Sequence, residues 1–432
     1  MLSRFGGLWR HPEFLRLWGA QTVSDFGSLI SHTALPFTAI LALDASAFEV
    51  ALLSASRIAA GLLVGLPAGV WVDRVARRPV MIAADIGRAL LLGSIPLAYA
   101  FDALRIEQLY AVAFAAGALT VIFDVAYQSY LPAVVSRDEL VEGNSKLTAT
   151  SSVAEFGAFS AGGWLVQALT GPVAILIDSV TFVVSAVFVR SIRTPEPPRT
   201  PPAGDVRLAR DALEGMRAVR RDAALRAIGG ATAMHSLGFG MASAVYLLFV
   251  TRELGLGPGV QGVIYAVGGL SSLWGALVAG RAARRLGAGP AMVLGLLLMG
   301  LSLLLTPLAG GATAVIVALL LAQQVVGDGG FTAWDITQLS WRQAAVPEHV
   351  LGRVNAFMRI LELAFTLAGA LLAGAFGETL GLRPTLFIAA GCIIAGAVWL
   401  LLSPVRSLRA APPAPASPAH PAPLEIADLG ER

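Results

Sequence analysis

The sequence predicts an all-α integral membrane protein whose twelve transmembrane helices form two parallel six-helix repeats. Three observations predict it. Only 14% of the 432 residues are charged and 56% are hydrophobic, whereas a soluble domain carries about 25% charged residues. The chain divides into twelve long apolar runs, and its two halves match at one constant offset. A charged fraction of 14% is too small to cover the surface of a soluble protein of this length.

Each apolar run is long enough for a helix that crosses a bilayer, which takes about 20 mainly apolar residues. The runs lack the alternating pattern of barrel strands, so helices are the expected element. The expected spans in the first half are 15–43, 48–72, 79–101, 106–130, 147–169 and 172–190. Those in the second half are 225–251, 259–281, 289–309, 312–338, 353–376 and 384–403.

An internal repeat relates the two halves. An offset of 211 residues aligns Gly69 with Gly280 and Asp124 with Asp335, and the match continues over about 140 positions. Because each copy holds an even number of spans, both copies have the same orientation. We therefore expect two parallel halves related by an axis along the membrane normal, with the transport pathway between them.

The basic residues predict the orientation of the chain. If the N-terminus is cytoplasmic, 24 of the 31 Lys and Arg residues fall in cytoplasmic segments and three in outer loops. This bias follows the positive-inside rule. We expect a multi-pass protein of the cell membrane with both termini in the cytoplasm.

Composition also divides the chain into four parts. We expect an N-terminal six-helix bundle over 1–190 and a C-terminal one over 225–405. Between them, 191–224 is a cytoplasmic linker rich in proline and charge, with an amphipathic helix in its second part. The Pro- and Ala-rich tail, 406–432, is predicted to be disordered.

Several functional classes are excluded by composition. One cysteine, Cys392, allows no internal disulfide and no cysteine-rich metal site. With Lys146 as the only lysine, the chain has no phosphate-binding loop of the G-x-x-x-x-G-K-[ST] type. A net charge of +3 is too small for a nucleic-acid footprint. We expect no enzymatic activity, no metal, no cofactor and no nucleic-acid partner.

One loop carries a family motif. The run Gly69-Val-Trp-Val-Asp73-Arg74-Val-Ala-Arg77-Arg78 matches G-x-x-x-D-R-x-x-R-R, so the chain resembles the major facilitator superfamily of transporters over residues 12–405. The resemblance implies that this loop is a gate in which Asp73 meets the eleventh span and the arginines pair with cytoplasmic acids. The alternative is a simple positive-inside anchor, for which the Gly69 and Asp73 positions would not be needed.

Shorter stretches resemble one branch of that superfamily. Residues 84–89, 130–132 together with 142–144, and 177–182 are similar to macrolide-efflux and enterobactin exporters. This similarity implies a drug:proton antiporter, and so proton-coupled efflux of an amphipathic drug or natural product, as in multidrug resistance. However, the run from Gly157 to Gly163 lacks the proline of the superfamily's antiporter motif. Proton-coupled uptake of a small polar nutrient is therefore the alternative.

Ionisable residues inside the membrane are costly and are candidates for proton coupling. Asp25 and His32 share one face of the first span, because Ser28 and these two residues are spaced three and four apart. A carboxylate in a partly desolvated cavity titrates nearer to neutrality. Asp328 and Glu155 are further candidates. The alternative for Asp25 is a structural pair with Arg57.

Further polar and aromatic residues are candidates for the substrate cavity, which the resemblance places between the first, fourth, seventh and tenth spans. These candidates are Asp124, Asp335, Gln324, His235, Arg57 and Trp334. Charge pairing at the inner gate is the alternative for the two aspartates, and helix packing for His235. Two pairs of opposite charge three residues apart, Asp85 with Arg88 and Arg359 with Glu362, are expected to be structural. We expect a monomer that binds a small molecule, protons and the lipid bilayer.

Overall fold

The computed structural model describes residues 7–194, 196 and 208–409, and these residues form helices and no strand. A short turn, η2 (Gly7–Arg10), precedes the first bundle. This bundle consists of α1 (Pro12–Phe37), α2 (Ala47–Val72), α3 (Arg77–Ala100), α4 (Ile106–Val134), α5 (Leu140–Leu169) and α6 (Gly171–Ser191). Helix α1 continues as a short π-helix, η3 (Thr38–Ala42), and η4 (Arg137–Glu139) precedes α5.

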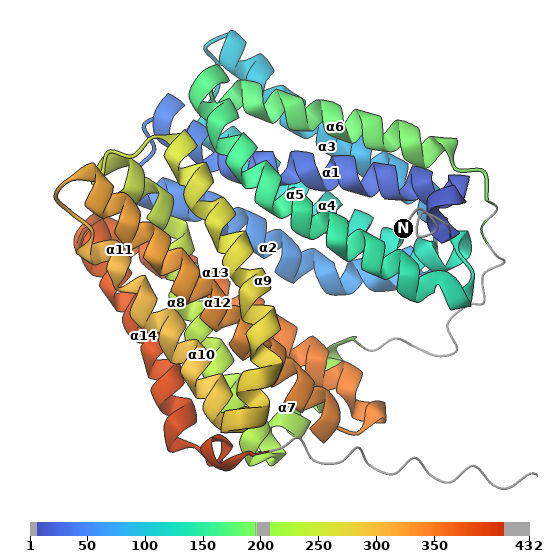
Figure 1. Cartoon of the computed structure of the whole chain (residues 1–432). Helices are drawn as coiled ribbons and strands as arrows, with labels where there is room; N and C mark the ends of the chain where they lie inside the picture. Colours follow the sequence, from blue (N-terminus) through green and yellow to red (C-terminus); the bar gives the residue numbers. More distant parts are fainter. Residues whose placement is uncertain (1–6, 195, 197–207, 410–432) are drawn as a thin grey trace, which may run out of the picture.

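The second bundle follows the linker helix α7 (Leu208–Arg221). It consists of α8 (Ala223–Arg252), α9 (Pro258–Leu286), α10 (Ala288–Leu303), α11 (Leu305–Leu308), α12 (Thr313–Ala345), α13 (Glu348–Thr379) and α14 (Leu382–Leu402), and ends in η5 (Pro404–Ser407). Helices α10 and α11 are two parts of one span, 288–308. The fold is thus all-helical with twelve membrane crossings in two six-helix halves (Figure 1).

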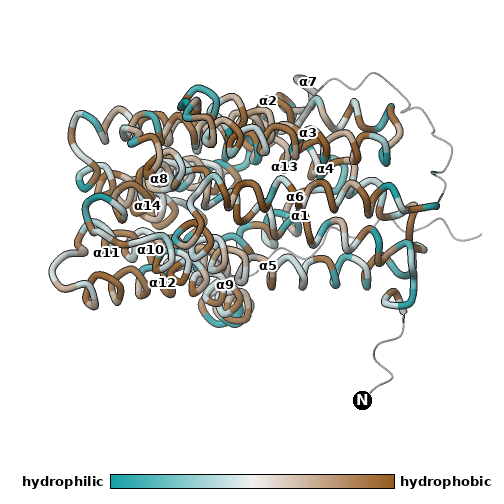
Figure 2. The backbone as a smooth tube through the Cα atoms, turned by 90° about the horizontal axis from the view of Figure 1, so that it is seen from above, coloured by the Kyte–Doolittle hydropathy of each residue, from teal (hydrophilic) through white to brown (hydrophobic). Residues whose placement is uncertain are grey.

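Ten of the described spans are long and apolar enough to cross a membrane by length and composition. The other two crossings, α1 and α5, are long enough but carry more polar side chains. They pack against each other and against α6 within the first bundle. Hydrophobic residues colour most of the helix lengths in Figure 2, and hydrophilic ones gather at helix ends and loops.

Local sequence signals set several helix boundaries. Ser46 begins α2 with a capping box, in which Glu49 N–H donates to the Ser46 hydroxyl and Ser46 N–H donates to the Glu49 carboxylate. The Asp222 carboxylate accepts from Leu225 N–H at 2.8 Å and begins α8. These caps satisfy amide groups that have no partner inside their own helices.

The two ends of the bundle differ in charge. We call the end that holds loop 73–76, helix α7 and the α12–α13 connection the basic end. The other end, with the loops 43–46, 101–105 and 253–257, is the opposite end. Helix α7 packs on α13 and α8 at the basic end. There Glu214 pairs with Arg353 at 3.0 Å, and Arg217 and Arg220 are exposed.

The halves meet along two helix pairs, α5 with α9 and α2 with α13. Gly163 of α5 lies against the Gly262 backbone, and Gly374 of α13 lies against Ala51 of α2. Both contacts lie toward the opposite end, where Asp44 also pairs with Arg252 at 2.5 Å. The helices of the two halves diverge toward the basic end (Figure 1).

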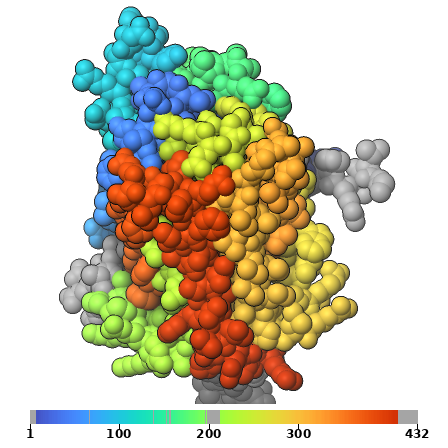
Figure 3. Space-filling model, turned by 90° about the vertical axis from the view of Figure 1, so that its left-hand side faces the viewer, coloured from blue at the N-terminus to red at the C-terminus, as the bar shows by residue number. Residues whose placement is uncertain are grey.

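Apolar packing also joins the halves near the opposite end. Ala51 and Ala55 of α2 belong to the hydrophobic core of the second half, and Leu247 and Leu248 of α8 belong to a core of the first half. A third core, at the basic end, is built from the first half alone. In the space-filling view, atoms of the two halves are in direct contact on the side shown (Figure 3).

Candidate functional site

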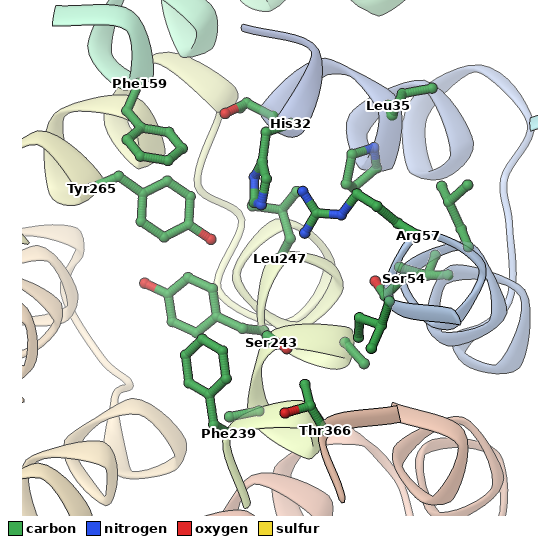
Figure 4. Close-up of a pocket in the computed structure, with 18 of the residues that line it drawn as sticks. His32, Leu35, Ser54, Arg57, Phe159, Phe239, Ser243, Leu247, Tyr265 and Thr366 are labelled. Carbon is green, nitrogen blue, oxygen red and sulfur yellow. The ribbon is translucent and has the colours of Figure 1, made fainter. Parts of the chain in front are cut away.

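A cavity of about 410 Å³ lies between the two halves. It falls within the range of small-molecule sites, about 300–1,000 Å³. Helices α1, α2, α4 and α5 line it from the first half, and α8, α9, α10, α12, α13 and α14 from the second. Figure 4 shows part of this lining. Its polar lining residues include His32, Ser54, Arg57, Ser243, Gln323, Gln324, Asp328 and Thr366.

His32 and Arg57 form the basic side of this cavity. Both side chains are exposed and line it, and the Arg57 guanidinium lies beside the His32 imidazole (Figure 4). In the part of the chain that the structure describes, Arg57 forms no ion pair with a carboxylate. Pro36, one turn after His32, has no N–H to donate to the His32 carbonyl. The backbone here therefore offers an acceptor beside two side chains that can donate.

Aromatic rings form the opposite wall. Phe159 of α5 contacts both His32 and Tyr265 of α9, with ring centroids 5.8 and 5.6 Å apart. The Tyr265 ring lies 5.9 Å from that of Tyr246 of α8. Because these rings come from both halves, a molecule packed against them would touch both halves of the protein.

One acidic side chain, Asp328 of α12, is among the lining residues of the cavity. Gln324 Nε2 donates to its carboxylate at 3.3 Å. This carboxylate also lies against Gly268 of α9, so it is held at the α9–α12 contact. The cavity thus has a basic side on the first half and an acidic, amide-bearing side on the second.

A second, polar pocket of about 270 Å³ lies inside the first half. Asp25 of α1 accepts hydrogen bonds there from Gln21 Nε2 at 2.7 Å and from Ser151 Oγ of α5 at 3.0 Å. Asp124 of α4 and Arg88 of α3 also line this pocket. Two carboxylates and one guanidinium therefore share a small space that is separate from the cavity between the halves.

Arg88 is held on all sides. Its guanidinium pairs with Asp85 at 2.5 Å and lies 4.5 Å from the Phe123 ring centroid and 4.0 Å from that of Phe182. Thr120 Oγ1 is a further partner at 3.4 Å. The predicted pairing of Asp85 with Arg88 is thus present, and so is that of Arg359 with Glu362, at 3.0 Å.

Asp25 and His32 occupy different pockets, although they share a face of α1. Their separation of seven positions corresponds to a rise of about 10 Å. His32 therefore reaches Arg57 of α2, whereas Asp25 lies at the level of Arg88 and Ser151. The alternative pairing of Asp25 with Arg57 is wrong for this structure, because the two residues line separate pockets.

The other predicted cavity residues divide between the pockets and the helix packing. Gln324 lines the cavity between the halves and Asp124 lines the pocket of the first half. His235 and Trp334 are buried with their rings 5.0 Å apart, and neither is a lining residue of the cavity. Asp335 accepts from Gln338 Nε2 at 3.0 Å and lines neither pocket. The Glu155 side chain lies outside the described residues.

The 69–78 loop is tied to its own half. The N–H groups of Arg77 and Arg78 donate to the Glu196 carboxylate at 3.0 and 2.9 Å. The Arg78 guanidinium donates to the carbonyl oxygens of Val189 and Arg190 at the end of α6. Asp73 is exposed, and within the described ranges its carboxylate forms no hydrogen bond or ion pair.

Sequence reasoning did not single out Ser151 or Tyr265, and it gave Arg88 only a structural role. Nothing in the sequence brings Ser151 to Asp25, because that contact depends on how α5 packs on α1. For Arg57, the sequence did indicate a role beyond a local ion pair. No acidic residue lies three or four positions from it, so a local ion pair could not account for its charge.

The model of the Major Facilitator Superfamily matches residues 17–232 and 228–429. The chain belongs to this superfamily. It is therefore a membrane transporter and not an enzyme. No curated protein sequence matches the chain significantly.

Solved transporters share the fold of this superfamily member. A bacterial homologue of the iron transporter ferroportin, in an inward-facing state, has a TM-score of 0.75 at 17% identity, with 93% of this chain and 100% of that chain covered. The nucleoside transporter NupG gives 0.74 at 13% identity, with 90% and 98% covered. A bacterial homologue of the human lysosomal transporter Spinster gives 0.69 at 14%, with 92% and 97% covered. Identities this low establish the fold alone.

Proposed function

We propose that the protein exports an amphipathic drug or natural product in exchange for protons by alternating access. The observation that carries this proposal is the aromatic cavity between the two halves. A site that both halves line can be exposed to either side of the membrane in turn when the halves rock. Its rings and apolar walls suit a bulky, partly hydrophobic cargo.

The orientation completes the proposal. We place the basic end in the cytoplasm, because cytoplasmic loops carry an excess of Lys and Arg. The contacts between the halves at the opposite end then close the outer side, and cargo enters the cavity from the cytoplasm. Both termini are cytoplasmic, and the protein lies in the cell membrane as a monomer.

Asp25 is the proposed proton carrier. Its carboxylate lies in a pocket of its own, so a proton and the cargo can bind at different places. The pocket is shared with Asp124 and Arg88, and binding a proton there changes the balance between two acids and one base. His32, Asp328 and Glu155 are secondary candidates.

Asp73 is the proposed gate residue. When the basic end closes, its carboxylate would meet the N-terminal end of α13, where the helix dipole favours an anion. Arg74, Arg77 and Arg78 order the same loop. The exposure of Asp73 in this structure fits a state in which that end is open.

The test is transport in inside-out membrane vesicles with an acidic lumen, using a panel of amphipathic drugs. Export by antiport predicts accumulation of a transported compound in the lumen when this gradient is imposed. Asp25→Asn should abolish the response to the gradient but retain exchange of labelled for unlabelled compound, because an amide of the same shape cannot carry the proton. Asp102→Asn, in a loop at the opposite end, is the matched control. Accumulation by Asp25→Asn at the wild-type rate would contradict the assignment of this residue.

The second candidate is proton-coupled uptake of a small polar nutrient. The amides of Gln323 and Gln324 and the hydroxyls of Ser54 and Thr366 along the cavity favour it, as does the missing proline of the antiporter motif. The same vesicles separate the two functions. A symporter would use the acidic lumen to move its substrate out of the vesicle, in the opposite direction to the exporter.

A further inference from the structure

Arg57 is a cation inside the membrane region that is exposed to the cavity and that no described carboxylate neutralises. It stands on α2 near the middle of the fold and turns its guanidinium into the cavity beside His32 (Figure 4). A charge at this depth is expensive and is kept where it faces a partner or a water-filled space. Among the described side chains of the surrounding helices no carboxylate pairs with Arg57, so we look for its partner among the contents of the cavity.

The acidic residue of the cavity does not take this place. The Asp328 carboxylate belongs to α12 of the second half, where it accepts from Gln324 Nε2 and lies against Gly268 of α9. The neighbours of Arg57 on its own wall are His32, Ser54 and apolar side chains. An anion brought in by the cargo would complete the basic side without displacing any existing ion pair.

We propose that the cargo is an amphipathic monoanion whose carboxylate binds Arg57. This inference rests on the proposed transport function and names the chemical class of its substrate. The guanidinium fork matches the two oxygens of a carboxylate, and such charge-assisted pairs are among the stronger hydrogen bonds. One arginine balances one negative charge, so a monoanion fits better than a phosphate ester.

The rest of the cavity fixes the shape of the cargo. Phe159 and Tyr265 stand next to His32 and offer ring faces to an aromatic body. A cavity of about 410 Å³ accepts a compound of drug size. Beyond the rings, Asp328 and Gln324 can accept from a hydroxyl or amine at the far end of the cargo. The cavity therefore fits a cargo that has a carboxylate at one end, an aromatic ring in the middle and a hydrogen-bond donor at the other end.

Four probes with the same ring system test the proposal: 2-naphthylacetate, 2-naphthylacetamide, 2-naphthylmethylamine and 2-naphthyl phosphate. Binding to the full chain in lipid nanodiscs is measured by titration calorimetry. We expect the carboxylate to bind about tenfold or more tightly than the amide, as one charged hydrogen-bonded pair would give. The amine and the phosphate ester should bind more weakly than the carboxylate.

Variants assign the preference to the residue. Arg57→Gln should bind carboxylate and amide equally, and its unchanged affinity for the amide shows that the cavity is intact. Arg57→Lys should keep part of the preference, since a point charge remains but the fork is lost. Arg105→Gln, which removes an arginine from the α3–α4 loop, should bind as the wild type does.

Three results would overturn the inference: tightest binding of the amine or the phosphate ester, no binding of the carboxylate, or a carboxylate preference that survives in Arg57→Gln. The binding measurements test this inference separately from the transport assay, which tests the proposed function. A protein that binds the carboxylate through Arg57 but moves no compound under a pH gradient would contradict the proposed function alone. A transporter without the charge preference would contradict this inference alone.

Discussion

Arg88 is a charged side chain that is also tightly packed. Its side chain is 2% exposed, its partner Asp85 is fully buried, and two phenylalanine rings enclose the guanidinium. A buried pair of this kind contributes little net stability when intact, because desolvation offsets the attraction between the charges. Breaking it leaves an uncompensated charge in the interior and is costly.

Arg88→Met is therefore expected to lower the free energy of unfolding by about 3–5 kcal/mol, because Asp85 is left buried without its partner. Thermal unfolding in detergent, followed by tryptophan fluorescence, measures the loss. The double variant Asp85→Leu, Arg88→Met should recover much of it. Arg359→Met breaks a pair of the same spacing that is 64% and 44% exposed, and it should shift the transition far less. An equal loss in Arg359→Met and Arg88→Met would contradict this account.

At the residue scale, the sequence could identify the charged side chains inside the spans but not their partners. The pairing of Asp85 with Arg88 was predictable because both lie on one helix, three residues apart. The contact of Asp25 with Ser151 and the position of His32 beside Arg57 were not, since Ser151 is on α5 and Arg57 is on α2. Which residues of two helices meet depends on their relative rotation and depth. Spacing along α1 reports neither quantity.

At the scale of elements, the contacts between the halves repeat the symmetry of the sequence. Gly163 and Gly374 are separated by the repeat offset of 211 residues, and so are their partners, Ala51 and Gly262. The α5–α9 contact and the α13–α2 contact are therefore two copies of one interface. In both, the absence of a side chain on the glycine lets the neighbouring helix come close.

Gly163→Val is expected to weaken closure at the opposite end. A Cβ at this position would strike the Pro258 carbonyl and the Gly262 backbone, and backbone atoms cannot move aside as a flexible side chain can. The halves must then separate there, which favours the other state of the transport cycle. Gly61→Val on α2 is the control, because a Cβ at Gly61 meets nothing within 4 Å.

Cross-linking measures this shift. Cysteines at Asp44 and Arg252, which form an ion pair at 2.5 Å, should be joined readily by a short bifunctional reagent when Cys392 is replaced by serine. The yield should fall in the Gly163→Val background and stay high with Gly61→Val. Equal yields in both backgrounds would show that the glycine contact does not control this end.

The number and order of the elements were predictable from the sequence, and the reason is physical. Each crossing must satisfy its own backbone hydrogen bonds within lipid, so a long apolar run leaves few alternatives to a helix. The same logic is weakest for α1 and α5, whose polar residues put them outside the ten spans recognised by length and composition. Those polar residues include Asp25 and Ser151, which face each other inside the first half.

For the whole molecule, the structure shows one arrangement of two halves that touch near the opposite end. The repeat symmetry permits a second arrangement in which they touch at the basic end. The Asp44–Arg252 pair is too exposed to decide between the two, since surface ion pairs contribute little. We therefore propose that the balance depends on the glycine contacts at one end and on Asp73 at the other.

Distances between spin labels test this balance. One label pair, Ser136→Cys with Leu286→Cys, reports on the basic end, and another, Asp102→Cys with Gly310→Cys, reports on the opposite end, each with Cys392→Ser. Alternating access predicts opposite changes, because the halves move as units. When a transported compound is added, the fraction of molecules in which the basic-end distance shortens should be similar to the fraction in which the opposite-end distance lengthens.

Asp73→Asn should suppress the population with the short basic-end distance, because the amide loses the attraction of a carboxylate for the N-terminal end of α13. A loss of about 0.3–1 kcal/mol, the usual strength of such a contact, lowers that population roughly two- to fivefold. Asp102→Asn, at the other end of the fold, is the control for the basic-end label pair. An unchanged distance distribution in well-inserted Asp73→Asn would assign the loop to membrane anchoring alone. The proposed gate would then have to be sought elsewhere at the basic end.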